Sequence, residues 1–287
     1  MTIQKARKRA KSGFTLIELS IVLVIIGLIV GGVLVGQDLI KAAEVRATIG
    51  QYEKYNATVN TFRTKYNGIP GDLAAASASA FGLCPTAGCM AGTTGLGDNS
   101  GLVTDTGGSA TLALGEPLAF WQQMTASNLI DGNYGAALTA GGAVATNTTG
   151  ASVGNFVPPA RIGRGNFWNA GAVDGINYYM LSGFGTTPIS TTGTLTFAGA
   201  ITPIEAFNID TKIDDGAPNT GTVQARGTIF TGAIYAALTT ANHAAYLATP
   251  TSSTCITGTT ATDTSNTYAR GTISGNNPNC ILRMRFN

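Results

Sequence analysis

Glu18 lies near the start of a long apolar run, where a charged side chain is costly. It is the single ionisable residue between positions 14 and 36, and a carboxylate at mid-membrane costs about 2.5–3.5 kcal/mol, with less near the interface. Such a group either reaches the lipid headgroups with its own side chain or finds a partner. Hydrolysis after Gly13 would supply a partner, because it would create an ammonium at Phe14 that could neutralise Glu18 in an adjacent copy.

The apolar run, residues 14–36, is long enough to cross a bilayer, for which about 20 apolar residues are needed. The leader before it, residues 1–13, contains five cations and no acid: Lys5, Arg7, Lys8, Arg9 and Lys11. This asymmetry predicts a cytoplasmic amino terminus and an exported body. An ordinary secretory signal is not indicated, because it would have a core of about 7–15 residues followed by an A-x-A site. Without Gly13 and Glu18, the segment would predict a plain single-span membrane anchor.

The run KSGFTLIELSIVLVIIGLI resembles the cleavage and methylation segment of type IV prepilins and of type II secretion pseudopilins. The resemblance implies that a prepilin peptidase and methyltransferase cuts after Gly13 and methylates Phe14. It also implies that Glu18 pairs with the amino terminus of a neighbour in a homo- or heteropolymer of pilin-like subunits. Many pilins have a helix-breaking proline where this chain has Val35, which leaves a pilus and a pseudopilus as open alternatives.

The resemblance therefore predicts a structural subunit, minor or specialised in view of its large body, rather than an enzyme. It implies a single pass through the bacterial inner membrane, with the body in the periplasm, or at the cell surface once a pilus is assembled. The alternative is a membrane-anchored periplasmic binding or adhesin protein that does not polymerise. A nucleic-acid partner is not expected, because removal of the leader changes the side-chain charge from +2 to −3.

The pattern after residue 36 predicts that the helix continues as an amphipathic rod to about residue 66. One face repeats apolar residues every three or four positions, as a helix requires: Val45, Ile49, Tyr52, Tyr55, Val59, Phe62 and Tyr66. The sequence NGIPGD at 67–72 supplies a stop. The expected organisation is a leader at 1–13, an apolar transmembrane and assembly half of the helix at 14–36, an amphipathic half at 37–66 and a globular body at 67–287.

The body is predicted to be α+β, with the long helix packed on an antiparallel sheet and short helices, as in pilins. One short helix is expected near Pro117, with a stop at Gly132, and another after Thr202, with Glu205 in capping-box register. Strands are expected at 175–181, 194–199, 222–230 and 280–286. Alternation in the last run predicts a half-buried closing strand.

Four cysteines in an exported body suggest two disulfides, because the periplasm and the cell exterior are oxidising. We favour Cys84 with Cys89 and Cys255 with Cys280 among the three pairings. The second pair would close a loop of about 25 residues, worth about 3 kcal/mol in the chain-entropy model. This loop resembles the C-terminal disulfide loop of many pilins. The CPTAGC spacing does not match a thioredoxin-type motif, and a single histidine, His243, gives little support for a zinc or catalytic site.

Asp210, Asp214 and Asp215 cluster near the end of the second short helix, where acids oppose the helix dipole. Two interpretations follow. The aspartates can stabilise a turn, as Asp-Gly sequences commonly do, or they can bind calcium together with carbonyl oxygens of the glycine turn. The order of ligands does not match an EF-hand loop. No other cofactor is expected, because the glycine-rich runs lack a phosphate-loop lysine.

Overall fold

The computed structural model describes most of the chain, in eleven segments. They are residues 13–83, 97–104, 116–134, 150–173, 175–184, 196–226, 229–231, 246–247, 255–258, 265–271 and 275–286. The chain divides into two compact units, the first ending at Ala43 and the second beginning at Glu44.

The first unit consists of the apolar part of helix α1, which runs from Leu16 to Tyr66. The large apolar side chains between Phe14 and Ile40 are all at least half exposed. Burial within the chain therefore does not account for their hydrophobicity, and this surface requires lipid or another protein to cover it.

The second unit begins with the amphipathic part of α1, and the predicted stripe faces its core. Val45, Tyr52, Tyr55, Val59 and Phe62 are buried. The helix ends as predicted at Tyr66, where Asn67 adopts a left-handed conformation with a φ of 53°. The amide of Asn67 still reaches the carbonyl of Arg63 at 2.8 Å, so a tight cap closes the helix.

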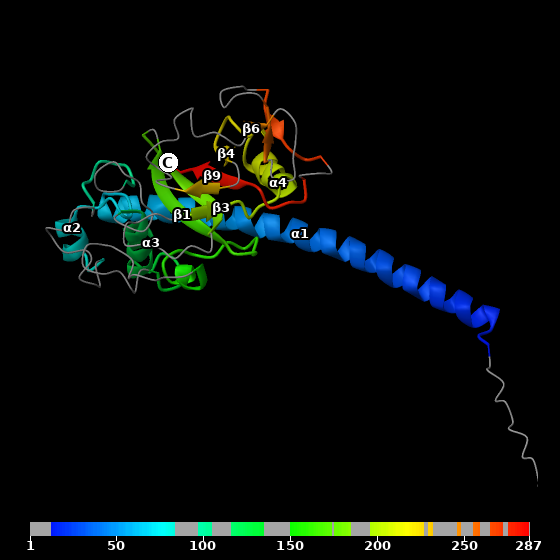
Figure 1. The fold of residues 1–287 in the computed structure, drawn as a ribbon. Helices are drawn as coiled ribbons and strands as arrows, with labels where there is room; N and C mark the ends of the chain where they lie inside the picture. The colour runs from blue at the N-terminus through cyan, green and yellow to red at the C-terminus, as the bar shows by residue number, and fades with distance from the viewer. Residues whose placement is uncertain are drawn as a thin grey trace, which may run out of the picture. The chain divides into compact units, whose positions relative to one another are not determined.

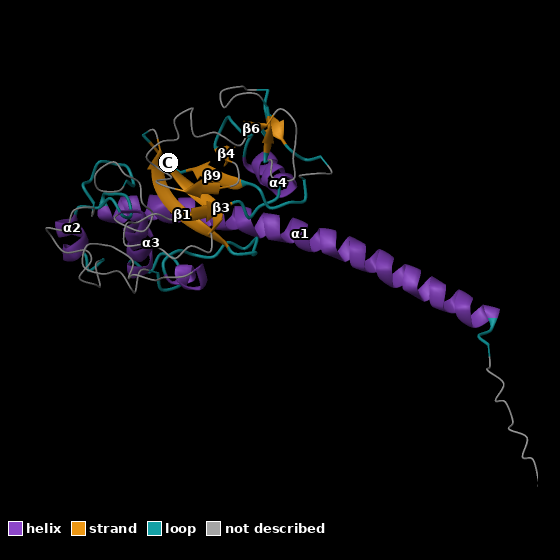
Figure 2. Ribbon diagram, viewed as in Figure 1, coloured by secondary structure: helices purple, strands orange, loops and turns teal. Residues whose placement is uncertain are grey.

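Short helices and strands make up the rest of the second unit, and Figure 2 shows the strands gathered beside α3 and α4. The helices are α2 (Ala75–Ala80), α3 (Glu116–Ala126), the 3₁₀ helix η2 (Gly150–Asn155) and α4 (Pro203–Ile213). The main-sheet strands are β1 (Asn166–Val173), β2 (Ile176–Phe184), β3 (Thr196–Ala198), β4 (Val223–Arg226), β5 (Ile229–Thr231) and β9 (Ile281–Arg285). A small sheet contains β6 (Tyr246–Leu247), β7 (Ile256–Thr257) and β8 (Thr267–Tyr268).

The main sheet is antiparallel throughout, in the order β4-β9-β2-β3-β5 with β1 paired to β2. Figure 1 shows the C-terminal strand β9, in red, inside the sheet beside β4. In the small sheet β7 pairs with β6 in parallel and with β8 antiparallel. This long helix with an antiparallel sheet and short helices confirms the predicted α+β, pilin-like fold class.

The ends of α4 match the sequence prediction. Thr202 caps the helix and accepts a hydrogen bond from the amide of Glu205, whose carboxylate accepts one from the amide of Thr202 at 3.0 Å. Pro203 is the first helical residue. The two reciprocal bonds satisfy amides that a helix start otherwise leaves unpaired.

Two strand predictions were wrong in detail. The single strand expected at 222–230 supplies two strands, because β4 pairs with β9 whereas β5 pairs with β3. The final strand is not half-buried, because residues 281–284 are buried on both faces. Its outward residue Arg283 lies over the Tyr178 ring, 4.7 Å from the centroid, and donates to Gln224 Oε1 at 2.7 Å, so polar contacts cover that face.

An aromatic cluster joins α1 to α3 and the sheet within the second unit. The Tyr55 ring lies 5.0 Å from Trp121 of α3 and 5.9 Å from Trp168 of β1, measured between centroids. Tyr179 of β2 is fully buried among these rings. Edge-to-face contacts of this kind contribute about 0.5–1.5 kcal/mol beyond area burial, and they make the amphipathic half of α1 part of the core.

Candidate processing and assembly site

The site predicted for processing lies at the start of α1. Gly13 and Phe14 are exposed and precede the helix. The leader residues 1–12 lie outside the described segments. The structure therefore describes Gly13 and the residues that follow the predicted cleavage point.

Glu18 folds back onto the residue that begins the helix. Its Oε2 accepts hydrogen bonds from the Thr15 amide at 2.8 Å and from the Thr15 hydroxyl at 2.7 Å. The Glu18 amide lies 3.4 Å from Thr15 Oγ1, and the Thr15 carbonyl accepts from the Leu19 amide at 3.3 Å. Thr15 and Glu18 therefore form a capping box, in which each side chain satisfies the other's backbone amide.

The sequence contains the signal for this capping box, a threonine followed three residues later by a glutamate, but the prediction did not use it. The carboxylate thus has a partner within its own chain before any assembly occurs. Both Thr15 donors bind Oε2, and among the described residues Oε1 of Glu18 has no hydrogen bond. One oxygen remains available to accept from a cation on another molecule.

The surroundings of Glu18 are apolar and exposed. Helix α1 is the one helix in the described part of the chain that is long and apolar enough to cross a membrane. The helix fits a membrane anchor, and within residues 14–36 Glu18 is the single carboxylate on an otherwise lipid-compatible surface.

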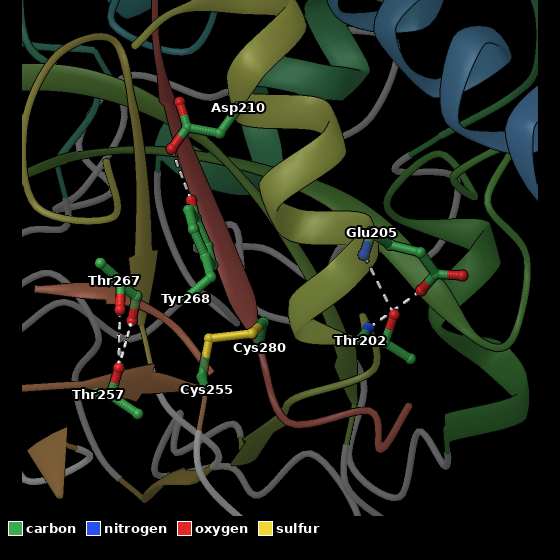
Figure 3. Close-up of a disulfide and its surroundings, with 8 residues drawn as sticks. All are labelled: Thr202, Glu205, Asp210, Cys255, Thr257, Thr267, Tyr268 and Cys280. Carbon is green, nitrogen blue, oxygen red and sulfur yellow. Dashed lines mark hydrogen bonds between the residues drawn. A yellow bond between two sulfur atoms is a disulfide. The ribbon is translucent and has the colours of Figure 1, made fainter. Parts of the chain in front are cut away.

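The second set of predicted site residues is the disulfide framework. The structure joins Cys255 to Cys280 across 25 positions, with a Cα–Cα distance of 5.1 Å. Both cysteines are fully buried. Figure 3 shows the disulfide between the small sheet and the start of β9, below the Asp210–Tyr268 contact. The bridge thus ties a segment made of two-residue strands to the start of β9, the strand beside the edge strand β4. Cys84, Cys89 and His243 lie outside the described residues.

Asp210, Asp214 and Asp215 do come together, with one carboxylate oxygen from each lying within 4.8 Å of the others. Tyr268 donates to Asp210 Oδ2 at 2.7 Å (Figure 3), and the Gly216 amide donates to Oδ1 at 3.2 Å. Asp215 accepts from the Ala217 amide and the Thr220 hydroxyl at 2.8 and 2.6 Å.

These contacts cover one edge of the main sheet, where β4 is the terminal strand. Asp214 Oδ2 accepts from the amides of Thr222 and Val223, and the Pro218 carbonyl accepts from the Ala225 amide at 2.9 Å. We call residues 214–222 the edge turn. Its hydrogen bonds satisfy amides that an edge strand would otherwise expose, as the turn interpretation predicts. Calcium binding at the same aspartates stays a prediction.

A second acidic group was not predicted from the sequence. Asp72, Asp98 and Glu116 also place carboxylate oxygens within 4.8 Å of one another. Asp72 accepts from the Gly101 amide at 2.8 Å, and Glu116 accepts from the Thr104 amide at 2.6 Å. The three acids are up to 44 residues apart in the sequence, so only the fold reveals the cluster.

Burial raises the pKa of the innermost carboxyl groups in both clusters. The pKa rises to about 6 for Asp72, to about 7 for Asp210 and to about 8 for Glu116. The cause in each case is that the ionised form loses hydration, and the backbone donors offset this loss only in part. Oxygen ligands of this kind suit hard cations such as calcium, but they also bind protons.

Comparison with known proteins gives one finding. Residues 8–34 match the family described as the prokaryotic N-terminal methylation motif, which is the signature of type IV prepilins and pseudopilins. No curated protein and no solved structure shows a significant match to the chain. The match supports a precursor of the type IV pilin or pseudopilin kind, a structural class with a membrane-compatible first helix.

Proposed function

We propose that this chain, which carries the prepilin methylation signature, is a structural subunit of a type IV pilus or a type II secretion pseudopilus. Prepilin peptidase cuts it after Gly13, the apolar part of α1 holds it in the inner membrane, and copies or related subunits then polymerise through that helix. The body is periplasmic before assembly. The observation that carries the proposal is the methylation motif at residues 8–34, placed at the start of an apolar helix with exposed side chains.

Charge neutralisation gives the proposed assembly step its physical basis. Hydrolysis of the bond between Gly13 and Phe14 leaves a carboxylate on the leader and an ammonium on the mature chain, and methylation of that amine keeps its positive charge. The ammonium stands beside the positive end of the helix dipole, which disfavours it. Oε1 of Glu18 in a neighbouring copy can accept from this ammonium while Oε2 keeps the Thr15 bonds.

Incorporation of variants into filaments tests this proposal. Glu18→Ala should be processed and membrane-inserted but depleted from purified filaments, because the neighbour's ammonium then has no partner. The matched control is Glu53→Ala, which removes an exposed acid from the amphipathic part of the same helix and should be incorporated normally. Equal incorporation of the two variants contradicts the proposed role of Glu18. If the unaltered chain stays in the membrane and never enters a filament, the protein is instead a membrane-anchored binding protein.

A further inference from the structure

A groove of about 460 Å³ opens on the second unit between α1, the segment that follows α3 and the loop before β1. This volume lies in the range of small-molecule sites. Its lining includes Tyr55 and Tyr134, which we call the tyrosine wall, and Pro158 and Pro159 of the loop wall. Tyr55 and Pro158 are buried, so Tyr134 and Pro159 provide the more exposed apolar surface. The groove lies outside the processing site and both acidic clusters, and the proposed polymerisation does not use it.

The loop wall of the groove is fixed in place by one side chain of α1. Gln51 Nε2 donates to the Pro159 carbonyl at 3.1 Å, and Gln51 Oε1 accepts from the Arg161 amide at 2.7 Å and from Trp168 Nε1 at 3.1 Å. Two adjacent prolines restrict the same loop further. Gln51 therefore acts as a positioning residue for the loop. A ligand that binds here would not have to order the loop, so this entropic cost of binding is small.

The tyrosine wall is also held in a defined position. A Cβ on Gly132 would lie 2.7 Å from the Tyr134 ring, and Gly132 has a φ of +114°. Only glycine combines that conformation with such a close approach. The Tyr134 ring consequently packs against the backbone of its own turn, and Tyr134 lines the groove from that position.

Charged groups stand at the rim of the groove. Lys54 pairs with Asp131 at 2.8 Å, and both side chains are exposed. Arg161 is exposed as well, and within the described part of the chain its guanidinium has no ion-pair partner. The rim thus offers the Arg161 guanidinium for an anion, beside a Lys54–Asp131 ion pair whose carboxylate can also accept hydroxyl donors.

We propose that this groove binds a sugar acid, a pyranose ring with a carboxylate, as part of an anionic polysaccharide. The apolar ring face packs against Tyr134 and Pro159, the carboxylate pairs with Arg161, and the sugar hydroxyls donate to Asp131. An uncharged proline-rich peptide would cover the same rings but would leave the guanidinium unpaired. The proposal does not depend on polymerisation, so it can fail while the proposed function stands.

Calorimetric titration of the full-length chain in detergent micelles tests this inference, with trigalacturonate as the probe and galactotriose as the neutral comparison. The unaltered chain should bind trigalacturonate, and Arg161→Ala should weaken that binding by about tenfold or more, as loss of a charge-assisted contact implies. The matched control is Arg46→Ala, which removes an exposed arginine from α1 outside the groove and should change the affinity by less than about twofold. Thermal unfolding of both variants verifies that they are folded.

Four results would overturn the inference. The unaltered chain shows no binding to trigalacturonate at millimolar concentration, or it binds galactotriose equally well. The two arginine variants lose affinity to the same extent, which would indicate unspecific attraction by positive charge. A proline-rich peptide binds while trigalacturonate does not, which would assign the groove to a protein partner.

Discussion

Replacing Glu116 by glutamine should flatten the pH dependence of stability at its alkaline end. Glu116 is 4% exposed, and its two carboxylate oxygens accept from the amides of Thr104 and Asp98 at 2.6 and 3.3 Å. Burial raises its pKa from 4.5 to about 8, and the nearby Asp72 acts in the same direction. The folded chain consequently holds this proton to a higher pH than the unfolded chain does.

The sign of the effect follows from proton linkage. Between the unfolded and folded pKa values the folded chain binds more protons, so this group's contribution to stability is full below about pH 4.5 and is lost as pH rises through about 8. One such group can change the free energy of unfolding by at most about 1.4 kcal/mol per pH unit. Over the interval from 4.5 to about 8 the total from Glu116 is at most about 5 kcal/mol, for a pKa that the amide donors of Thr104 and Asp98 already lower.

The assay is the free energy of unfolding of the full-length chain in detergent, measured by urea titration between about pH 5 and pH 9. Asp72 and Asp210 titrate at about 6 and 7, so the decline above about pH 7 comes mainly from Glu116. Glu116→Gln should remove that part and make the decline at lower pH shallower, leaving there the share of Asp72 and Asp210. Glu53→Gln, at an exposed position, should leave the whole curve unchanged. An unaltered slope above pH 7 in Glu116→Gln, or stability that rises with pH in the unaltered chain, would refute the reasoning.

Three further predictions concern the core, the disulfide and the edge turn. Tyr179→Phe should raise the free energy of unfolding by about 1 kcal/mol, because the buried Tyr179 hydroxyl has no hydrogen-bond partner among the described residues. Tyr52→Phe should lower the free energy of unfolding by about 1 kcal/mol, because it loses the 2.8 Å hydrogen bond to the Arg285 carbonyl of β9. Urea titration in which both variants change the free energy of unfolding in the same direction would contradict these opposite predictions. Joint replacement of Cys255 and Cys280 by serine should cost about 3 kcal/mol and increase amide hydrogen exchange in the small sheet, and unchanged exchange there would argue against the tethering role. Calcium should not shift the melting temperature, because turn amides and hydroxyls occupy the aspartates, and a concentration-dependent rise abolished by Asp215→Asn would restore the calcium interpretation.

Local patterns predicted α1, α3 and α4, because the determinants of a helix are close together in the sequence, whereas the short helices α2 and η2 were not predicted. The apolar stripe of α1 needs residues only three or four apart, and the Thr202–Glu205 capping box is confirmed at its predicted start. The same rule applies to Thr15 and Glu18, whose spacing is identical. That capping box was missed because the carboxylate was interpreted only through its membrane cost and its intermolecular partner.

Features that depend on distant segments could not be predicted. Strand β1 contains Asn166, Asn169 and Gly171, and its polar and apolar residues do not alternate clearly. Only its pairing with β2 therefore defines it as a strand. The burial of Arg283 depends on Tyr178 and Gln224, which approach it through strand pairing. The groove likewise combines three separate segments, so its residues have no pattern that a sequence scan could detect.

The predicted division of the chain at residues 13, 36 and 66 remains a prediction that chemistry must test. The leader boundary depends on a peptide bond that an enzyme recognises, and the boundary at 36 depends on where lipid ends. Neither is a property of packing within the chain. The structure supplies the helix that carries both boundaries, which is continuous from Leu16 to Tyr66.

The most direct test of the central claim is mass spectrometry of the chain recovered from purified filaments. We predict that its first peptide begins at Phe14, with one methyl group on the amino terminus and no leader residues. A filament-borne chain that retains residues 1–13, or one whose terminus lies at another bond, would contradict the account.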